Sequence, residues 1–159
     1  MSAAPDGRVV SVNVSAEKGV QKAPAESVVF VVEHGIRGDA HAGPWLRQVS
    51  VLADESAGKM RAAGGDIGHG DFGENVTTEG LRVSDLPVGS RMRMGAALLE
   101  VTQIGKECHA PCAIYRQVGD CVMPREGIFV RVLEGGEVRP GDEIRLDKPS
   151  LIRAAVLTV

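Results

Sequence analysis

Residues 86–105 read LPVGSRMRMGAALLEVTQIG, and this stretch decides the fold class. Met92 and Met94 alternate with Arg91 and Arg93, so one face of an extended chain is apolar and the other is charged. This alternation is typical of a β-strand, and Gly95 predicts a bend or bulge before the strand continues through residues 97–105. Residues 138–146, VRPGDEIRL, repeat the design of a turn followed by a strand.

The rest of the chain adds further strands and one helix. Strands are predicted over residues 8–14, 27–33 and 47–53, and over residues 127–136 with a hairpin exit. The run at 27–33 is continuously apolar and predicts a buried strand. Asp54 can cap a helix that runs to about residue 63, where two glycines follow. Short strands separated by glycines predict a mainly β (β-rich α+β) protein, a partly closed β-barrel with a few short helices.

Composition narrows the functional classes. The chain has 159 residues, 43% of them hydrophobic, with a formal net charge of -3 and only 3% aromatic residues. These values fit one globular domain, and they argue against a generic nucleic-acid binder, which needs basic patches and stacking rings. The first residues have no apolar signal core, and no apolar run is long enough to cross a bilayer, so we expect a cytoplasmic protein without membrane partners.

All three cysteines lie in residues 106–121, KECHAPCAIYRQVGDC. A structural disulfide fits poorly, because the number is odd and cytosolic thiols are kept reduced. Zinc held by Cys108, His109, Cys112 and Cys121 lacks a second ligand pair at the usual distance. Cys112 follows a proline in a predicted loop with cations nearby in the sequence, which suits a reactive thiolate or a soft metal ligand. Packing of Cys112 in the core is an equally open alternative.

A glycine-rich loop at residues 38–43 holds Asp39 and His41, which flank one residue and project to the same side of an extended chain. They can bind a ligand or orient a catalytic group, and the alternative is a loop-stabilising Asp beside a surface His. Arg37 and Arg47 bracket this loop and suit an anionic oxygen cluster, unless they are solvated surface charges.

A second loop presents Glu74, Asn75, Thr77 and Thr78 after a glycine. These side chains can read the donors and acceptors of a heterocycle, or they can hold the loop through side-chain-to-backbone bonds. His69 has no evident partner in the sequence and is predicted to lie on the surface.

Taken in order, the loops GIRGDAHAG, RQVSVLADES, GDFGENVTTEGL, LPVGSRMRMG, PC and GIFVRVLEGGEVRPGDEI resemble the MOSC domain family. The family is named after the C-terminal domain of the molybdenum cofactor sulfurase, and the match spans residues 8–146. The resemblance implies a barrel-like fold that binds molybdenum cofactor (molybdopterin) or handles its sulfur. It also implies that a family cysteine matching Cys112 ligates molybdenum in relatives that reduce N-hydroxylated compounds. Leu46 departs from the family, where relatives often have a histidine.

The resemblance implies roles for the loop residues. Cys112, Asp39 and His41 are the catalytic candidates, and Cys112 is also the metal ligand. The cofactor-binding candidates provide cations and polar groups for the phosphate and the ring: Arg37, Arg47, Glu74, Asn75 and Thr77.

We therefore expect a molybdenum cofactor-binding domain in cofactor biosynthesis or sulfur handling, with Cys112 as molybdenum ligand or sulfur carrier. Its partners would be the small-molecule cofactor and a cofactor-synthesis protein or sulfur donor. One alternative is a molybdenum-dependent reductase of N-hydroxylated purines or related compounds, and another is a non-catalytic partner domain with an inert Cys112. Residues 1–148 would form the domain. The tail at 149–159 resembles the opening strand of a molybdopterin adenylyltransferase-type domain and would begin a truncated second domain.

Overall fold

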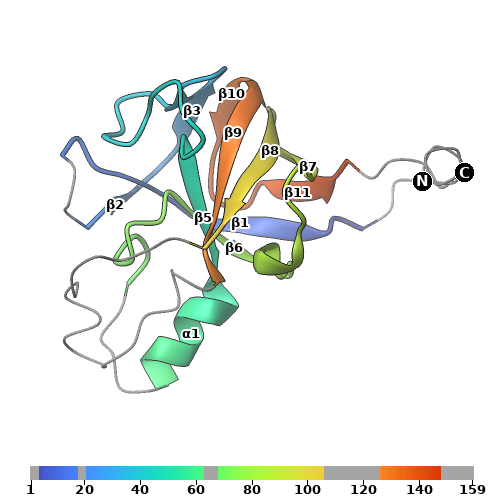
Figure 1. The fold of residues 1–159 in the computed structure, drawn as a ribbon. Helices are drawn as coiled ribbons and strands as arrows, with labels where there is room; N and C mark the ends of the chain where they lie inside the picture. The colour runs from blue at the N-terminus through green and yellow to red at the C-terminus, as the bar shows by residue number, and fades with distance from the viewer. Residues whose placement is uncertain (1–3, 18–20, 63–67, 106–125, 148–159) are drawn as a thin grey trace, which may run out of the picture.

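A closed barrel of seven strands forms the body of the computed structural model, which describes residues 4–17, 21–62, 68–105 and 126–147 (Figure 1). Hydrogen-bonded neighbours run around it as β11, β7, β8, β9, β5, β6 and β1, and β1 pairs again with β11. The bounds are β1 Gly7–Val14, β5 Val49–Ala53, β6 Val76–Glu79, β7 Arg91–Met94, β8 Ala97–Ile104, β9 Ile128–Glu134 and β11 Glu143–Leu146. The predicted mainly β barrel is confirmed, and the pairing of β1 with β11 closes it fully.

Antiparallel pairing dominates the barrel. In the described part of the chain, β5 and β6 are the one parallel pair, and helix α1 (Asp54–Ala62) lies between them in sequence. A parallel pair needs such a crossover, because its strands cannot be joined by a tight turn. β1 also carries a short edge strand, β2 (Ala23–Ala25), and a 3-10 turn (Val83–Asp85) precedes β7.

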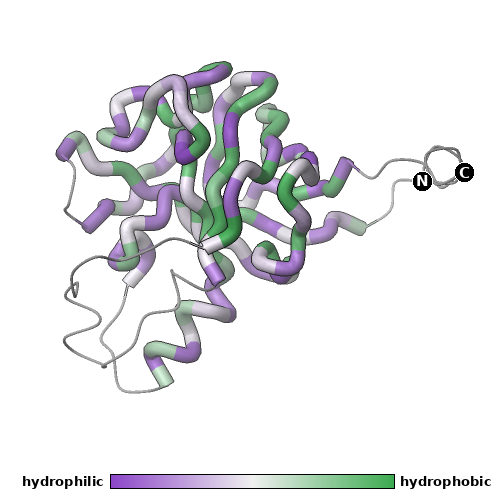
Figure 2. Tube along the Cα trace, viewed as in Figure 1, coloured by the Kyte–Doolittle hydropathy of each residue, from purple (hydrophilic) through white to green (hydrophobic). Residues whose placement is uncertain are grey.

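The barrel interior is filled with aliphatic side chains and methionines. Met92 and Met94 are fully buried, whereas Arg91 and Arg93 are exposed, as the alternation predicts. Figure 2 shows hydrophobic and hydrophilic residues following one another along the barrel strands. Burying one such side chain stabilises the fold by roughly 1.5–3 kcal/mol. The core also includes Val9, Val12, Val51, Val76, Leu99, Val101, Val130, Val132 and Ile144.

Gly95 forms a tight hairpin, so the predicted bend within one strand is wrong. Met94 pairs with Ala97, and two residues connect β7 to β8. Gly95 has a φ of 56°, in the left-handed region that glycine adopts most easily. The alternating buried positions shift by one residue, from Met92 and Met94 to Leu99 and Val101. A bulge also produces such a shift, so the pattern alone did not distinguish a bend from a reversal.

A smaller sheet packs beside the barrel, with the order β10 (Gly136–Val138), β3 (Val28–Val31) and β4 (Gly35–Ile36). The predicted hairpin exit after β9 is wrong, because β10 pairs with β3. A Cβ on Gly135 would lie 2.6 Å from the Phe30 carbonyl oxygen, so the close approach at this sheet change requires glycine.

The strand predicted as buried over residues 27–33 is only half-buried. Val28 and Phe30 face the core, whereas Val32 is 50% exposed. In a three-stranded sheet beside the barrel, one face of the strand is left toward solvent.

Helix α1 matches its prediction over residues 54–62, with Asp54 and Glu55 in the first turn and Lys59 and Arg61 in the last. These charges complement the helix dipole. Among the described residues, no helix is long and apolar enough to cross a membrane. The glycines at 64–65 and the tail at 148–159 lie outside the described residues, so the domain boundary stays a prediction.

Candidate functional site

A cavity of about 100 Å³ opens where two loops meet β5 and β9. Its lining includes three predicted site residues from separate stretches of the sequence, namely His41, Arg47 and Asn75. Tertiary structure therefore places the two predicted loops around one space. The complete lining in the described part of the chain is His41, Trp45, Arg47, Ser50, Gly73, Asn75 and Phe129.

Two neighbours fix the guanidinium group of Arg47 in the cavity wall. Its Nε donates a hydrogen bond to Gln103 Oε1 at 3.0 Å, and the group lies 5.3 Å from the centre of the Phe129 ring. The terminal nitrogens make no hydrogen bond within the described part of the chain. A fixed guanidinium with open donors suits a phosphate or carboxylate oxygen.

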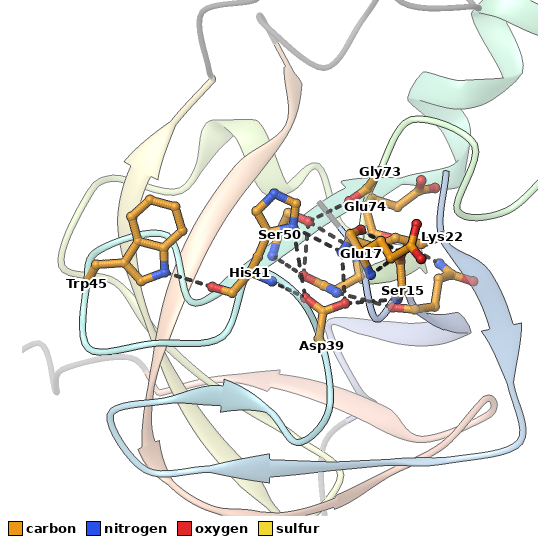
Figure 3. A network of polar contacts seen from close by, with 11 residues as sticks. Ser15, Glu17, Lys22, Asp39, His41, Trp45, Ser50, Gly73 and Glu74 are labelled. Atoms are coloured by element: carbon orange, nitrogen blue, oxygen red, sulfur yellow. Dashed lines mark hydrogen bonds and ion pairs between the residues drawn. The ribbon is translucent and has the colours of Figure 1, made fainter. Parts of the chain in front are cut away.

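Asp39 is a buried carboxylate beside His41 and Lys22 (Figure 3). Its side chain is 0% exposed, and it accepts hydrogen bonds from Lys22 Nζ at 2.8 Å and from the backbone amides of Ser15 and His41. Burial alone would raise the pKa of Asp39, but these hydrogen bonds and the charge of Lys22 outweigh it and lower the pKa. Asp39 is therefore a carboxylate at neutral pH.

Trp45 forms the outer wall and is tied to the same loop. Its Nε1 donates to the His41 carbonyl oxygen at 2.8 Å, while 43% of the residue stays exposed. Figure 3 shows His41 between the Trp45 indole and the Lys22–Asp39 pair. Leu46, the departure from the family pattern, is 61% exposed, and its carbonyl accepts a hydrogen bond from Thr102.

Asn75 holds the cavity floor together. Its Oδ1 accepts from both the amide and the hydroxyl of Ser50, at 3.0 and 3.2 Å, and its Nδ2 donates to the Asn13 carbonyl. These bonds match the alternative that the loop is held by side-chain-to-backbone contacts.

Glu74 and Thr77 lie behind the cavity and do not line it. Both are fully buried, and Glu74 accepts hydrogen bonds from Thr77 Oγ1 at 3.1 Å and the Phe72 amide at 3.2 Å. Burial raises the pKa of Glu74 to about 7, although these hydrogen bonds lower it in part. A contact of either residue with a cofactor stays a prediction.

We predict that Glu74 makes stability fall as the pH rises. Because its pKa is raised from 4.5 to about 7, the folded state holds the proton more tightly than the unfolded state. The favourable contribution, about 3 kcal/mol, is fully present below pH 4.5 and is lost as the pH rises to about 7. Urea unfolding of the wild type and of Glu74→Gln across this range measures it. A difference between the two that does not vary with pH would contradict the account.

The remaining predicted residues have different locations. Arg37 is exposed and does not line the cavity. His69 has a partner that the sequence did not reveal, because its Nε2 lies 3.4 Å from Asp54 Oδ1. Cys112 lies outside the described residues, as do Cys108, His109 and Cys121. No group of three His, Cys, Asp or Glu side chains that could hold a metal occurs among the residues the structure does describe.

Two glycines that flank residues 106–125 in the sequence lie near Arg47. The amide of Gly105 donates to the Gly127 carbonyl at 2.6 Å, so the described residues on either side of residues 106–125 are adjacent. Gln103 and Phe129, which pair across β8 and β9, are the residues that hold Arg47.

Sequence reasoning missed Lys22, Trp45, Ser50 and Phe129. Lys22 lies with Lys18 in a polar connection, and Ser50 and Phe129 belong to stretches that were predicted as strands without a role in the site. Trp45 had a usable signal, because it is the single tryptophan of the chain and adjoins the Asp39–His41 loop.

Comparison with known families matches residues 38–145 to the MOSC domain, which is more than half of the chain. The chain belongs to the MOSC domain family. MOSC domains are associated with functions related to the molybdenum cofactor.

Relatives of this MOSC domain agree in fold. The uncharacterized protein YflK of Bacillus subtilis (strain 168) is 28% identical over 141 residues, 82% of this chain, which spans only 63% of YflK. The crystal structure of YuaD from Bacillus subtilis has a TM-score of 0.73 at 21% identity, covering 87% of this chain and 93% of YuaD. YiiM from Geobacillus stearothermophilus has a TM-score of 0.66 at 23% identity, covering 91% and 77%.

The cavity of this MOSC domain fits one end of a molybdenum cofactor. Arg47 offers open cationic donors of the kind a phosphate takes, and Trp45 and His41 offer planar groups beside them. At about 100 Å³ the cavity is smaller than the roughly 300–1,000 Å³ of whole-ligand pockets. The described lining residues would therefore contact only part of such a cofactor.

Proposed function

We propose that this MOSC domain binds molybdenum cofactor and acts in cofactor biosynthesis or sulfur handling. The main support is the Arg47 guanidinium, which has open donors and stands in one cavity with His41 and Trp45. The wall of this cavity is close to Gly105 and Gly127, which are hydrogen-bonded to each other. These two glycines flank the stretch of sequence that contains Cys112. In this proposal Cys112 is the molybdenum ligand or the sulfur carrier, and the partner protein is a cofactor-synthesis protein or sulfur donor.

The residues of the chain would divide the work of binding. Arg47 would hold the phosphate, and Arg37 would add a second cation from the exposed loop. Asn75 would keep the floor of the cavity in shape through its bonds to Ser50. The bound cofactor would supply a molybdenum centre that accepts a soft thiolate and exchanges electrons or sulfur.

A second candidate function is reduction of N-hydroxylated purines or related compounds. The observation that favours it is His41 in the cavity wall, because reduction of an N–OH group consumes protons and a titratable side chain can provide them. The reduction takes two electrons and two protons and releases water, so turnover of a hydroxylaminopurine by cofactor-loaded protein with an added chemical reductant separates a reductase from a sulfur carrier.

We predict that Cys112→Ser removes molybdenum from the protein, whereas Cys121→Ser leaves it bound. A hydroxyl is a much poorer ligand for this soft site than a thiolate, and Cys121 serves as the matched cysteine control. Both variants are purified from cells that make the cofactor, and molybdenum per protein is measured by mass spectrometry. Equal occupancy in Cys112→Ser and the wild type would remove the role of Cys112 as molybdenum ligand and leave only that of sulfur carrier.

A further inference from the structure

Lys22 is a buried lysine that the proposed function does not use. Its side chain is 1% exposed, and its ammonium group lies 2.8 Å from Asp39 Oδ1. Its backbone is held as well, because its amide donates to the Gly70 carbonyl at 3.0 Å. Removing a charged group from water costs free energy, so a buried ammonium group needs partners that compensate its charge. The contacts of Lys22 therefore indicate what its burial achieves.

The second contact of the Lys22 ammonium determines the hydrogen-bonding state of His41. Nζ lies 3.1 Å from His41 Nδ1, and an ammonium group can only donate, so Nδ1 must be the acceptor. Asp39 Oδ2 lies 4.0 Å from Nδ1, which is too long for a hydrogen bond. A neutral imidazole that accepts at Nδ1 carries its proton on Nε2.

The two predicted proton-handling residues therefore have different roles. Asp39 has no exposed side-chain surface, and its oxygens accept from Lys22 and from two backbone amides. His41 lines the cavity, and its side chain is 36% exposed. Only His41 of this pair lines the cavity, and among the described residues the charged groups near it are Lys22, Asp39 and Arg47, which lines the same cavity.

We propose that Lys22 is a positioning residue that fixes His41 as the Nε2–H tautomer. Lys22 also holds Asp39 as a structural carboxylate, so that His41 alone exchanges a proton in the cavity. The role of this proton rests on the proposed function, but the tautomer is a property of the protein without ligand. It is measured without molybdenum or pterin, so its failure and that of cofactor binding are distinguishable.

The test is ¹⁵N NMR of histidine-labelled, ligand-free protein at neutral pH, with His41 assigned by the loss of its signals in His41→Gln. In the wild type we expect Nδ1 at the position of an unprotonated nitrogen and Nε2 at that of a protonated one. In Lys22→Met the two signals should move toward each other, because Nδ1 has then lost the hydrogen bond donated by the ammonium group. Lys22→Met/Asp39→Asn makes the same measurement without an unpaired buried carboxylate, in case the single variant does not fold.

The control is Lys59→Met, which removes a lysine whose side chain is 55% exposed and which pairs with Glu126. Its His41 signals should match those of the wild type. A protonated Nδ1 in the wild type would overturn the proposal. Unchanged His41 signals in the folded Lys22 variants would overturn it too, because Lys22 would then be a structural residue without control of the tautomer.

Discussion

Lys22→Met is expected to lower the free energy of unfolding by about 3–5 kcal/mol, because it leaves the buried Asp39 carboxylate without its charged partner. The side chains of Lys22 and Asp39 are 1% and 0% exposed and lie 2.8 Å apart. The carboxylate must then be protonated, draw water into the barrel wall, or force the loop at 38–43 to open. Urea denaturation with an optical probe measures the loss.

Two further variants separate this effect from the loss of a lysine as such. Lys59→Met breaks an exposed ion pair of 2.7 Å and should cost less than about 1 kcal/mol. Lys22→Met/Asp39→Asn removes both charges and should recover part of the stability lost in the single variant. A Lys22→Met loss no larger than that of Lys59→Met would show that the buried pair contributes little.

Gly70→Ala is expected to cost about 3–4 kcal/mol, from left-handed backbone and from a steric clash together. Gly70 has a φ of 86°, and a Cβ at this position would lie 2.2 Å from the carbonyl oxygen of Lys22. The clash is with backbone, so no rotamer change relieves it. Relief requires breaking the hydrogen bond from the Lys22 amide to the Gly70 carbonyl, which helps hold Lys22 in place.

Gly73→Ala is the matched control in the same loop. Gly73 has a φ of 81°, but a Cβ there would meet nothing within 4 Å. It should therefore show only the cost of left-handed backbone, about 1–2 kcal/mol. Thermal and urea unfolding of both variants give the comparison. Equal losses would mean that the contact with Lys22 does not matter.

The parts of the fold that follow a local pattern could be predicted from the sequence. The alternation of Met92 and Met94 with arginines gave a strand with one buried face, and Asp54 marked the start of α1. The hairpin at Gly95 and the sheet change at Gly135 could not be derived in this way. Which strands pair there depends on contacts between residues far apart in sequence, such as Gly135 with Phe30.

In the candidate site, too, some residues could be predicted from local sequence and others only from contacts made after folding. Asp39, His41, Arg47 and Asn75 were found because polar residues in glycine-rich loops are unusual for a spacer, and three of them line the cavity. Lys22 was missed because its contacts with Asp39 and His41 exist only after folding. The raised pKa of Glu74 likewise results from burial, which the sequence of a glycine-rich loop does not indicate. The role of Cys112 remains a prediction, because it lies outside the described residues.

The most direct test of cofactor binding is the molybdenum and pterin content of the wild-type protein purified from cells that make the cofactor. The account predicts molybdenum and pterin together, in equal amounts and bound to a substantial fraction of the protein. The same protein from cells unable to synthesise the cofactor should contain neither. Protein from the cofactor-producing cells that contains neither molybdenum nor pterin, while a known cofactor-binding protein from the same cells is loaded, would contradict the central claim.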